Sequence, residues 1–204
     1  MKFIADFHIH SSYSRATSKN LSPRLLNENA KIKGIKVLGT GDITHPQWLN
    51  NLKQELIEKE EGLYVLKNEF NNNNTTRFLL TGEISLIYKK NEKVRKVHIL
   101  LLVPNFEKEE KIQKKLEELK FNIKSDGRPI LGIDAIKILD IFLNISEDIL
   151  FVPAHIWTPW FSLLGDKSGF DSLTECFEDM SQYIYAVETG LSSDPPMNWI
   201  CSFL

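Results

Sequence analysis

The stretch FIADFHIH, residues 3–10, places two histidines directly after a short apolar run. The run is typical of a buried β-strand, and residues two apart in an extended chain point to the same side. His8 and His10 can therefore converge on one metal ion. A His-x-His pair by itself is equally consistent with two polar residues in a loop after a strand. The rest of the chain must favour one of these interpretations.

Strands and helices alternate beyond this stretch. Ser22 and Pro23 provide an N-cap and a first-turn proline for a helix that ends at Gly34, and Pro46 begins a second helix that we expect to end at Gly62. The other expected elements are strands at 2–7, 35–39, 63–70, 76–88, 97–103, 149–153 and 184–188, and helices at 107–120, 134–144 and 171–182. This alternation predicts an α/β fold with a mostly parallel sheet, open or closed into a barrel. In such folds the chemistry lies at the carboxyl ends of the strands.

Composition restricts the class of protein. A chain of 204 residues with 42% hydrophobic and 25% charged residues suits one globular domain with a substantial core. The formal net charge of -2 gives no global attraction to nucleic acid or to an anionic membrane. Two cysteines are too few for a disulfide framework, and the N-terminal apolar run is too short for a signal peptide or a membrane span. We therefore expect a cytoplasmic protein with no membrane partner.

Imidazole and carboxylate side chains recur at the predicted strands. Asp42 follows the strand at 35–39, Glu83 lies inside an apolar strand where an unpaired charge would be costly, His98 begins one strand and His155 ends another. Such ligands suit Zn, Mn or Fe, and a carboxylate such as Glu83 can bridge two ions about 3.5–4 Å apart. Clusters of this kind activate water and stabilise both oxygens in a phosphate-ester displacement. The pattern favours a metal-dependent phosphoesterase.

In this order, the motifs resemble the PHP (polymerase and histidinol phosphatase) superfamily of metal-dependent phosphoesterases. The resemblance is carried by His8-Ile9-His10, Gly41-Asp42, Gly82-Glu83-Ile84-Ser85, Val97-His98-Ile99-Leu100 and Pro153-Ala154-His155. Within the superfamily, the segments GTGDITHPQWL (39–49), PAHIWTPW (153–160) and VETGLSSDPPMNW (187–199) are similar to the endonuclease Q family, over essentially the whole chain.

The resemblance implies a PHP-type distorted (β/α)7 barrel with two or three divalent metal ions, Zn, Mn or Mg, at its strand ends. The metal ligands that it implies are His8, His10, Asp42, Glu83, His98, His155 and Glu188. It also implies a metal-dependent DNA endonuclease that acts in DNA repair and cleaves the phosphodiester 5′ of deaminated bases (uracil, hypoxanthine) or of abasic sites. Relatives continue into a strand with an Asp-x-His ligand pair and then a nucleic-acid-binding region. We therefore expect one PHP-type domain over residues 1–204, truncated before its last strand.

Four further residues are candidates for contacts with the substrate. Arg15, five residues after His10, can place its guanidinium on a scissile phosphate, and Asp194 is a second candidate catalytic residue in the segment that matches the family. Trp157 and Trp160 lie in a proline-broken segment after the strand at 149–153. The two rings can stack against an extruded base, or they can pack at the mouth of the barrel.

Two other groups of residues have competing interpretations. His45 is either an additional ligand or a cap before Pro46. The basic residues of segment 89–96 form a solvated hairpin or contact phosphates.

Two other functions are compatible with the same residues. One is a PHP-type phosphatase that acts on a small phosphomonoester, and the other is an inactive truncated remnant. Activity on a nitrophenyl phosphate compared with lesion-bearing DNA distinguishes the two catalytic alternatives, and metal stoichiometry with a thermal melt tests the third.

Overall fold

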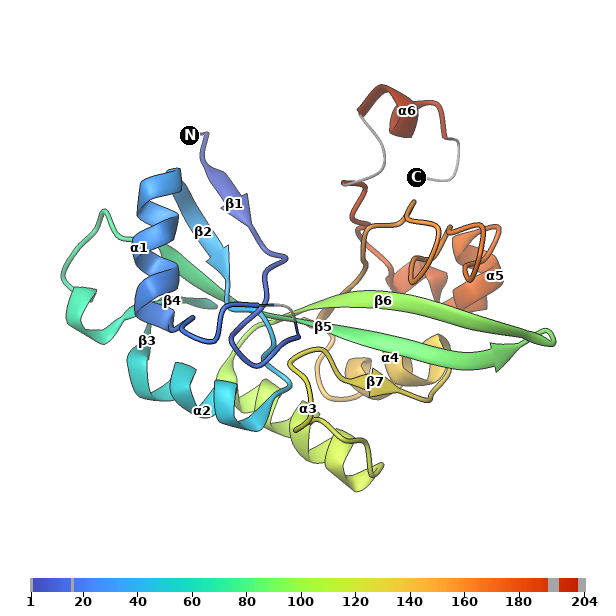
Figure 1. The fold of residues 1–204 in the computed structure, drawn as a ribbon, viewed down its shortest axis with the longest axis horizontal. Helices are drawn as coiled ribbons and strands as arrows, with labels where there is room; N and C mark the ends of the chain where they lie inside the picture. Colours follow the sequence, from blue (N-terminus) through green and yellow to red (C-terminus); the bar gives the residue numbers. More distant parts are fainter. Residues whose placement is uncertain (1, 16, 191–194, 202–204) are drawn as a thin grey trace. The chain divides into compact units, whose positions relative to one another are not determined.

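The computed structural model describes residues 2–15, 17–190 and 195–201 of the chain (Figure 1). The chain consists of two compact units. Unit 1 comprises Met1–Glu83 and Leu102–Pro129, and unit 2 comprises Ile84–Leu101 and Ile130–Leu204. The prediction of one PHP-type domain over residues 1–204 stays a prediction.

Unit 1 contains a mixed sheet in the strand order β1-β2-β5-β4-β3. Its strands are β1 (Ile4–Asp6), β2 (Ile35–Gly39), β3 (Leu56–Glu60), β4 (Leu63–Leu66) and the first part of β5 (Arg77–Lys90). β1, β2 and β5 run parallel, whereas β3 and β4 form an antiparallel hairpin beside β5. The predicted α/β class is correct, but hairpins make the sheet mixed rather than mostly parallel.

The register of the three parallel strands positions the candidate site. Leu38 of β2 lies opposite Asp6 of β1 and Phe78 of β5. Because the carboxyl ends of parallel strands share one edge of a sheet, the residues that follow these positions come together at that edge. His8 follows β1, Asp42 follows β2, and Glu83 lies further along β5.

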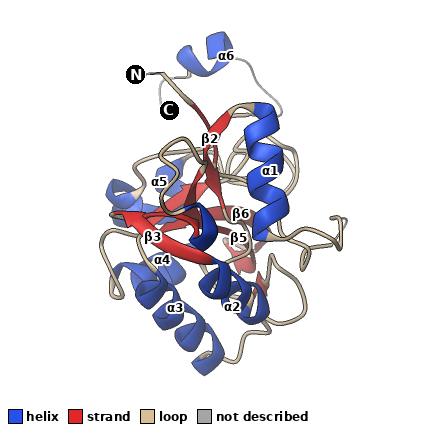
Figure 2. Cartoon of the chain, turned by 90° about the vertical axis from the view of Figure 1, so that its left-hand side faces the viewer, coloured by secondary structure: helices blue, strands red, loops and turns tan. Residues whose placement is uncertain are grey.

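The helices of unit 1 begin and end as their capping residues dictate. α1 (Pro23–Lys33) has Ser22 as its N-cap, which accepts a hydrogen bond from the Leu25 amide, and ends at Gly34 with φ 72°. α2 (Pro46–Glu55) and α3 (Phe106–Glu118) follow, and a short 3-10 helix, η1 (Lys67–Glu69), lies after β4. Figure 2 shows α1, α2 and α3 as blue ribbons around red strands. Trp48, Leu52 and Phe78 are fully buried in this core.

The end of the second predicted helix is wrong. Residues 56–60 form β3 and not the last turns of a helix, because this segment pairs with β4 through a tight turn at Gly62, whose φ is 73°. Tertiary pairing thus overrides the helical preference of a Glu- and Lys-rich segment. β1 also differs from the prediction, because Phe3 and Ile4 are exposed; β1 pairs with β2 alone, at the edge of the described sheet.

Unit 2 begins with a long hairpin, drawn in green in Figure 1. The second part of β5 leads through Asn91 and Glu92, with φ 52° and 61°, into β6 (Lys93–Val103). Two consecutive positive φ values are characteristic of a type I′ turn, whose twist matches that of the flanking strands. β6 also pairs with β8 (Leu150–Pro153), and β7 (Ile130–Leu131) runs parallel to β5.

Unit 2 has four helices among the described residues, and the first two contribute to an aromatic core. The four are α4 (Ala135–Leu143), α5 (Leu173–Phe177), the 3-10 helix η2 (Glu178–Tyr183) and α6 (Pro195–Trp199). Phe151 of β8 contacts Phe142 and Phe177 edge-to-face, with ring centroids 6.3 and 6.0 Å apart. None of the described helices in the chain combines the length and the apolar character needed to cross a membrane.

The predicted strand at 184–188 is wrong, because that segment is irregular. Its last residue bonds to β8 and to the loop that follows β8: the Glu188 amide donates to the Pro153 carbonyl at 2.9 Å, and the Glu188 carbonyl accepts from the Ile156 amide at 2.8 Å. Two bonds at a single residue fix the position of Glu188 without forming a ladder.

Candidate metal centre

Unit 1 gathers His8, His10 and Glu83 at the edge where its parallel strands end. His8 Nε2 lies 3.5 Å from Glu83 Oε1, and His10 Nε2 lies 3.5 Å from Glu83 Oε2. The candidate ligand atoms of these residues lie within 4.8 Å of one another. Glu83 is 1% exposed, whereas the two imidazoles are 16% and 26% exposed, so the cluster can be reached from solvent on the histidine side.

Asp42 orients His10. The buried Asp42 carboxylate contacts His10 Nδ1 through Oδ1 at 2.9 Å, and its Oδ2 accepts from the Ser11 amide (2.6 Å), the Ser11 hydroxyl (2.7 Å) and the Ser14 hydroxyl (2.8 Å). A carboxylate only accepts hydrogen bonds, so Nδ1 of His10 carries a proton, and Nε2, which lies on the Glu83 side, is the nitrogen that can bind a cation. This is the arrangement that fixes a metal-binding histidine in one tautomer. The ligand role predicted for Asp42 stays a prediction; its hydrogen bonds favour a positioning role.

The turn that carries Asp42 has an unusual backbone. Gly41 and Asp42 both have positive φ, 65° and 48°. A Cβ at Gly41 would lie 2.5 Å from the Ile9 carbonyl oxygen, so only glycine fits against the His8–His10 segment. The Trp48 indole donates to the Gly41 carbonyl at 2.8 Å, which anchors the turn to α2.

A loop between α3 and β7 completes the cluster of unit 1. Arg128 Nη1 donates to Glu83 Oε2 at 3.1 Å, and its backbone amide donates to Asp126 Oδ1 at 3.1 Å. The Gly127 amide donates to the Tyr13 carbonyl at 3.1 Å. A Cβ at Gly127 would overlap the Asp42 carboxylate, so the loop packs directly on the residue that orients His10.

Unit 2 contains a second group of predicted ligands. His98 Nδ1 lies 3.3 Å from His155 Nε2, and the His98 carbonyl accepts from the Ala154 amide at 3.0 Å. The His155 amide donates to Glu188 Oε2 at 2.7 Å. His155 has φ 31°, an uncommon backbone conformation of the kind that concentrates at functional sites.

The residues present fit a divalent cation. Two imidazole nitrogens and a buried carboxylate in unit 1, and a close pair of imidazoles in unit 2, are the donor types that divalent transition metals prefer. These ligand types are shared by several metals, so the donor set is compatible with Zn or Mn and gives no preference between them.

The other predicted site residues lie in several environments. Arg15 is 86% exposed, with Nε 3.2 Å from Asp126 Oδ2. Trp157 is half-buried and donates its indole N–H to Asn198 Oδ1 at 2.7 Å, whereas Trp160 is 52% exposed. Asp194 lies outside the described residues. The roles predicted for these four residues stay predictions.

His45 caps a helix. Its Nδ1 accepts from the Trp48 amide at 3.4 Å, and its Nε2 contacts the Lys124 carbonyl at 3.2 Å. Burial lowers the pKa of His45, although the Lys124 carbonyl and the charges of Asp42 and Asp126 act in the opposite direction. A neutral ring with Nε2 protonated satisfies both contacts, so the structure favours the capping interpretation over the ligand one.

The basic hairpin is only partly solvated. Arg95 is buried, pairs with Glu175 at 2.9 Å and stacks on Phe170 at 4.2 Å. Lys90 pairs with Glu178 at 2.8 Å. These contacts within unit 2 hold two of the cations of the hairpin on the protein.

Comparison of the sequence with known proteins finds two relatives. No family model matches the chain. The uncharacterized protein MJ0043 of Methanocaldococcus jannaschii is 31% identical over 170 residues, which cover 83% of this chain and 18% of that protein. The uncharacterized protein YqxK of Bacillus subtilis is 31% identical over 213 residues, 96% of this chain and 50% of that protein. The chain thus spans half the length, or less, of these relatives.

Two crystal structures of endonuclease Q superpose with a TM-score of 0.78 and 34% identity over 95% of this chain. One is a complex with a 27-mer duplex substrate that has an abasic lesion at the active site, and the other is the lesion-specific endonuclease from Pyrococcus furiosus. The chain is an endonuclease Q-like member of the PHP superfamily. It covers 44% and 43% of those two endonuclease Q chains.

A third crystal structure supports the PHP-type fold alone. A protein from Bifidobacterium adolescentis assigned as a metal-dependent phosphoesterase has a TM-score of 0.59 and 15% identity, over 96% of this chain and 80% of that one. The PHP-type fold expected from the sequence is therefore confirmed.

Sequence reasoning missed three residues around the centre of this PHP protein. Ser11 and Ser14 bind Asp42, and Arg128 binds Glu83. The serines lie inside the motif that follows His10, where a need for hydrogen-bond donors to a buried carboxylate was a usable signal. Arg128 follows a turn rather than a strand, so no strand-end pattern indicates it.

Proposed function

We propose that this chain is a metal-dependent hydrolase of phosphate esters and, within that class, a DNA endonuclease of lesion repair. It cleaves the phosphodiester bond 5′ of a deaminated base (uracil or hypoxanthine) or of an abasic site. The observation that supports the proposal is the buried Glu83 carboxylate facing His8 and His10, with Asp42 fixing the His10 tautomer, on a chain similar to endonuclease Q over 95% of its length.

Each residue of the centre has a role in this proposal. His8, His10 and Glu83 hold a divalent cation in unit 1, Asp42 orients His10, and the second group, His98, His155 and Glu188, supplies further ligands in unit 2. A divalent cation supplies Lewis-acid chemistry, because it polarises a phosphoryl oxygen and makes water a stronger nucleophile. Two or three ions, Zn, Mn or Mg, are proposed in total.

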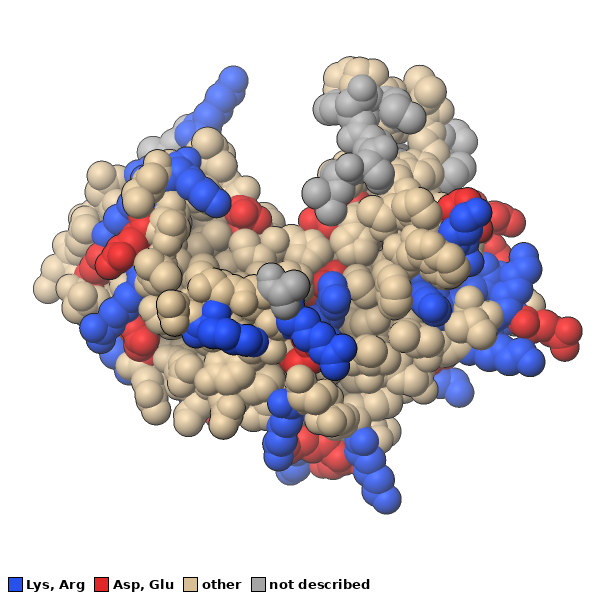
Figure 3. All heavy atoms as spheres, viewed as in Figure 1, with Lys and Arg blue, Asp and Glu red and all other residues tan. Residues whose placement is uncertain are grey.

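DNA recognition in this proposal depends on local and not global charge. The net charge of the chain is -2, and basic and acidic side chains are interspersed over the face shown in Figure 3. A cation at the centre and nearby guanidinium groups therefore provide the attraction for phosphate. Arg15, which is exposed, is proposed to contact a DNA phosphate. Asp194 is proposed as a catalytic residue.

Two tryptophans in unit 2 are proposed to contact the lesion. Trp157 lines a pocket of about 340 Å³ together with Lys93, Gly165 and Phe170. Trp160 presents an exposed ring beside the Lys96 ammonium, 5.3 Å away. Aromatic rings of this kind stack on unpaired bases irrespective of sequence.

A nicking assay tests the proposal. Duplexes that carry one uracil, one hypoxanthine or one abasic site are incubated with the 204-residue chain and Mn²⁺, Mg²⁺ or Zn²⁺, beside an unmodified duplex. We expect a single nick 5′ of the lesion, absent without metal and absent for His10→Ala. If the protein holds metal but nicks none of these duplexes, the endonuclease proposal is refuted.

The same protein tests the two alternatives. Hydrolysis of a nitrophenyl phosphate without nicking of DNA would favour a phosphatase. A chain that binds no metal and melts without cooperativity would favour an inactive remnant.

A further inference from the structure

The geometry points to Arg128 as the residue that binds the non-bridging phosphate oxygens of the substrate at the metal centre of unit 1. This inference rests on the proposed function and names a substrate-binding residue for it. Arg128 was not among the residues that the sequence motifs indicated.

Arg128 contacts the centre directly and still has donors to offer. Its Nη1 lies 3.1 Å from Oε2 of Glu83, the oxygen that also faces His10 Nε2. The Glu83 carboxylate is 1% exposed, whereas the Arg128 side chain is 40% exposed, so the guanidinium reaches from solvent to a buried carboxylate. Nε and Nη2 of Arg128 make no hydrogen bond with any residue that the structure describes.

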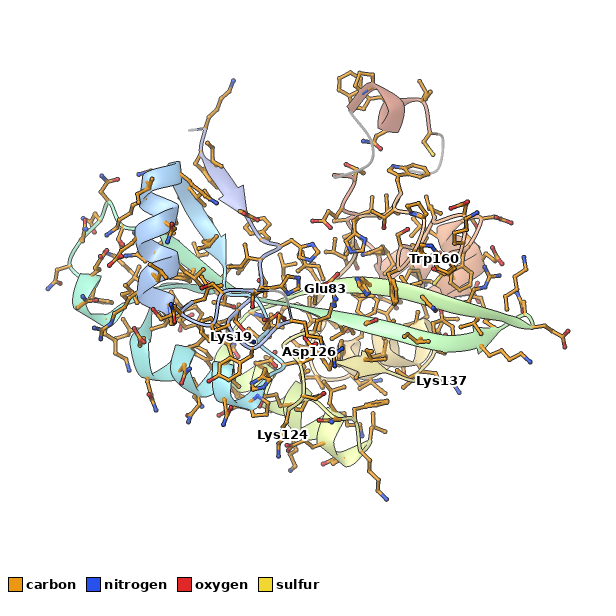
Figure 4. The ribbon with its side chains drawn as sticks, in the orientation of Figure 1. Lys19, Glu83, Lys124, Asp126, Lys137 and Trp160 are labelled. Atoms are coloured by element: carbon orange, nitrogen blue, oxygen red, sulfur yellow. The ribbon has the colours of Figure 1, made fainter. Side chains whose placement is uncertain are left out.

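The backbone beneath Arg128 is held in place on both sides. Asp126 Oδ1 accepts from the Arg128 amide at 3.1 Å, and the Gly127 amide donates to the Tyr13 carbonyl at 3.1 Å. Gly127 has no room for a Cβ because Asp42 and Ser14 lie against it. Figure 4 labels Glu83 and Asp126, the two acidic residues that bind Arg128. A guanidinium held at its base can be positioned for a ligand at little entropic cost.

Neutralising the buried Glu83 carboxylate accounts for only part of this arrangement, because it uses Nη1 alone and leaves the other donors of a half-exposed guanidinium available. A positive charge 3.1 Å from Glu83 also competes with a metal cation for the same carboxylate. Such a charge is useful where an anion joins the metal, because a guanidinium offers parallel N–H donors that match two oxygens of a phosphate.

Binding of inorganic phosphate to the Mn²⁺-loaded 204-residue chain tests the inference. Isothermal titration is carried out on the unsubstituted chain and on Arg128→Ala, Arg128→Lys and Lys124→Ala. Lys124 is the matched control, because it lies four residues earlier on the same loop, is 71% exposed and pairs with Glu117 at 3.3 Å. Figure 4 labels it.

We expect Arg128→Ala to weaken the affinity for phosphate about 10- to 100-fold, the range for loss of hydrogen bonds from a charged group. Arg128→Lys keeps the charge and loses the paired donors, so its affinity for phosphate is expected to lie between those of the unsubstituted chain and Arg128→Ala. The affinity of Lys124→Ala is expected to be within about 2-fold of that of the unsubstituted chain. The affinity for Mn²⁺, titrated separately, is expected to stay the same or to increase in Arg128→Ala. A thermal melt of each variant controls for folding.

Four results would overturn the inference, and the first three concern the affinity for phosphate. They are phosphate affinity that is unchanged in Arg128→Ala, an equal loss in Lys124→Ala, and an unsubstituted Mn²⁺-loaded chain that binds no phosphate. Loss of Mn²⁺ affinity in Arg128→Ala, with phosphate binding restored by excess Mn²⁺, would also overturn it, because Arg128 would then only position Glu83. The nicking assay is independent: a chain that binds phosphate through Arg128 but cuts no lesion refutes the proposed function and leaves this inference in place.

Discussion

Replacement of Asp42 by asparagine isolates the orientation of His10. The carboxylate of Asp42 has four hydrogen-bond partners: His10 Nδ1 on Oδ1, and the Ser11 amide and the Ser11 and Ser14 hydroxyls on Oδ2. The Ser11 amide can only donate, so the oxygen of the new side-chain amide must face it. The NH2 group then faces His10 Nδ1, which must accept. The proton of the ring moves to Nε2, and His10 no longer offers that lone pair to a cation.

The size of the effect follows from these bonds. Restoring the metal-binding tautomer in Asp42→Asn leaves two donors facing each other, at a cost of about 1–3 kcal/mol. That cost corresponds to a decrease of about 10- to 100-fold in metal affinity, the range for loss of such supporting contacts. The three bonds to the serines remain but lose the charge of the acceptor, so we expect the free energy of unfolding to fall by about 1–3 kcal/mol.

Titration with Co²⁺ or Mn²⁺ and urea denaturation without metal measure these two quantities. Ser14→Ala is the matched control, because it removes one donor to Oδ2 and a 3.4 Å contact with His10 Nδ1 but keeps the Asp42 carboxylate that accepts from this nitrogen. It should destabilise the chain by about 1 kcal/mol and keep metal affinity within about 3-fold. Metal affinity in Asp42→Asn equal to that of the unsubstituted chain would refute the reasoning, as would an equal loss in Ser14→Ala.

Three further predictions concern other residues. Both carboxylate oxygens of Glu109 are buried without a hydrogen-bond partner among the described residues, and burial raises the pKa of this group well above its usual value. Because the unfolded chain loses the proton first, the free energy of unfolding should fall as pH rises above the usual pKa of glutamate, by at most about 1.4 kcal/mol per pH unit, up to the pKa in the folded chain. The urea midpoint is measured at several pH values, from just above the usual pKa of glutamate up to about pH 7. It should change less with pH in Glu109→Gln than in the unsubstituted chain, and an equal change in the two proteins would contradict this. Gly127→Ala should lower the free energy of unfolding by about 1–3 kcal/mol and weaken metal binding, because the new methyl group overlaps Asp42. Gly132→Ala is the control, since a Cβ there meets nothing within 4 Å, and it should leave metal binding unchanged. Equal metal affinity in the two variants would contradict this prediction. Mn²⁺ at about 100 times its Kd should raise the free energy of unfolding by about 2.7 kcal/mol, which a rise in the melting temperature reports. His8→Ala should lose this gain, because it removes one candidate ligand. An equal gain in both proteins would mean that the ion binds elsewhere.

Some of the fold could be predicted because its signals are local. Ser22 and Gly34 cap α1 as the sequence indicated, since a hydroxyl acceptor and a left-handed glycine act within one turn of the chain. β3 could not be predicted, because its Glu- and Lys-rich segment becomes a strand only through pairing with β4. His45 shows the same limit: its role as a cap depends on the Lys124 carbonyl, which lies 79 residues further along the chain.

The sequence by itself determined the alternation of strands and helices. It indicated His8 and His10 as candidate ligands because residues two apart in an extended chain share a side, and Glu83 because an apolar strand tolerates a carboxylate only with a partner. Only the tertiary structure decided which partners those are. Asp42 reaches Ser11 across 31 residues, and Arg128 reaches Glu83 across 45. No local pattern specifies contacts of that separation, because they arise where parallel strands end at one edge and a distant loop packs over it.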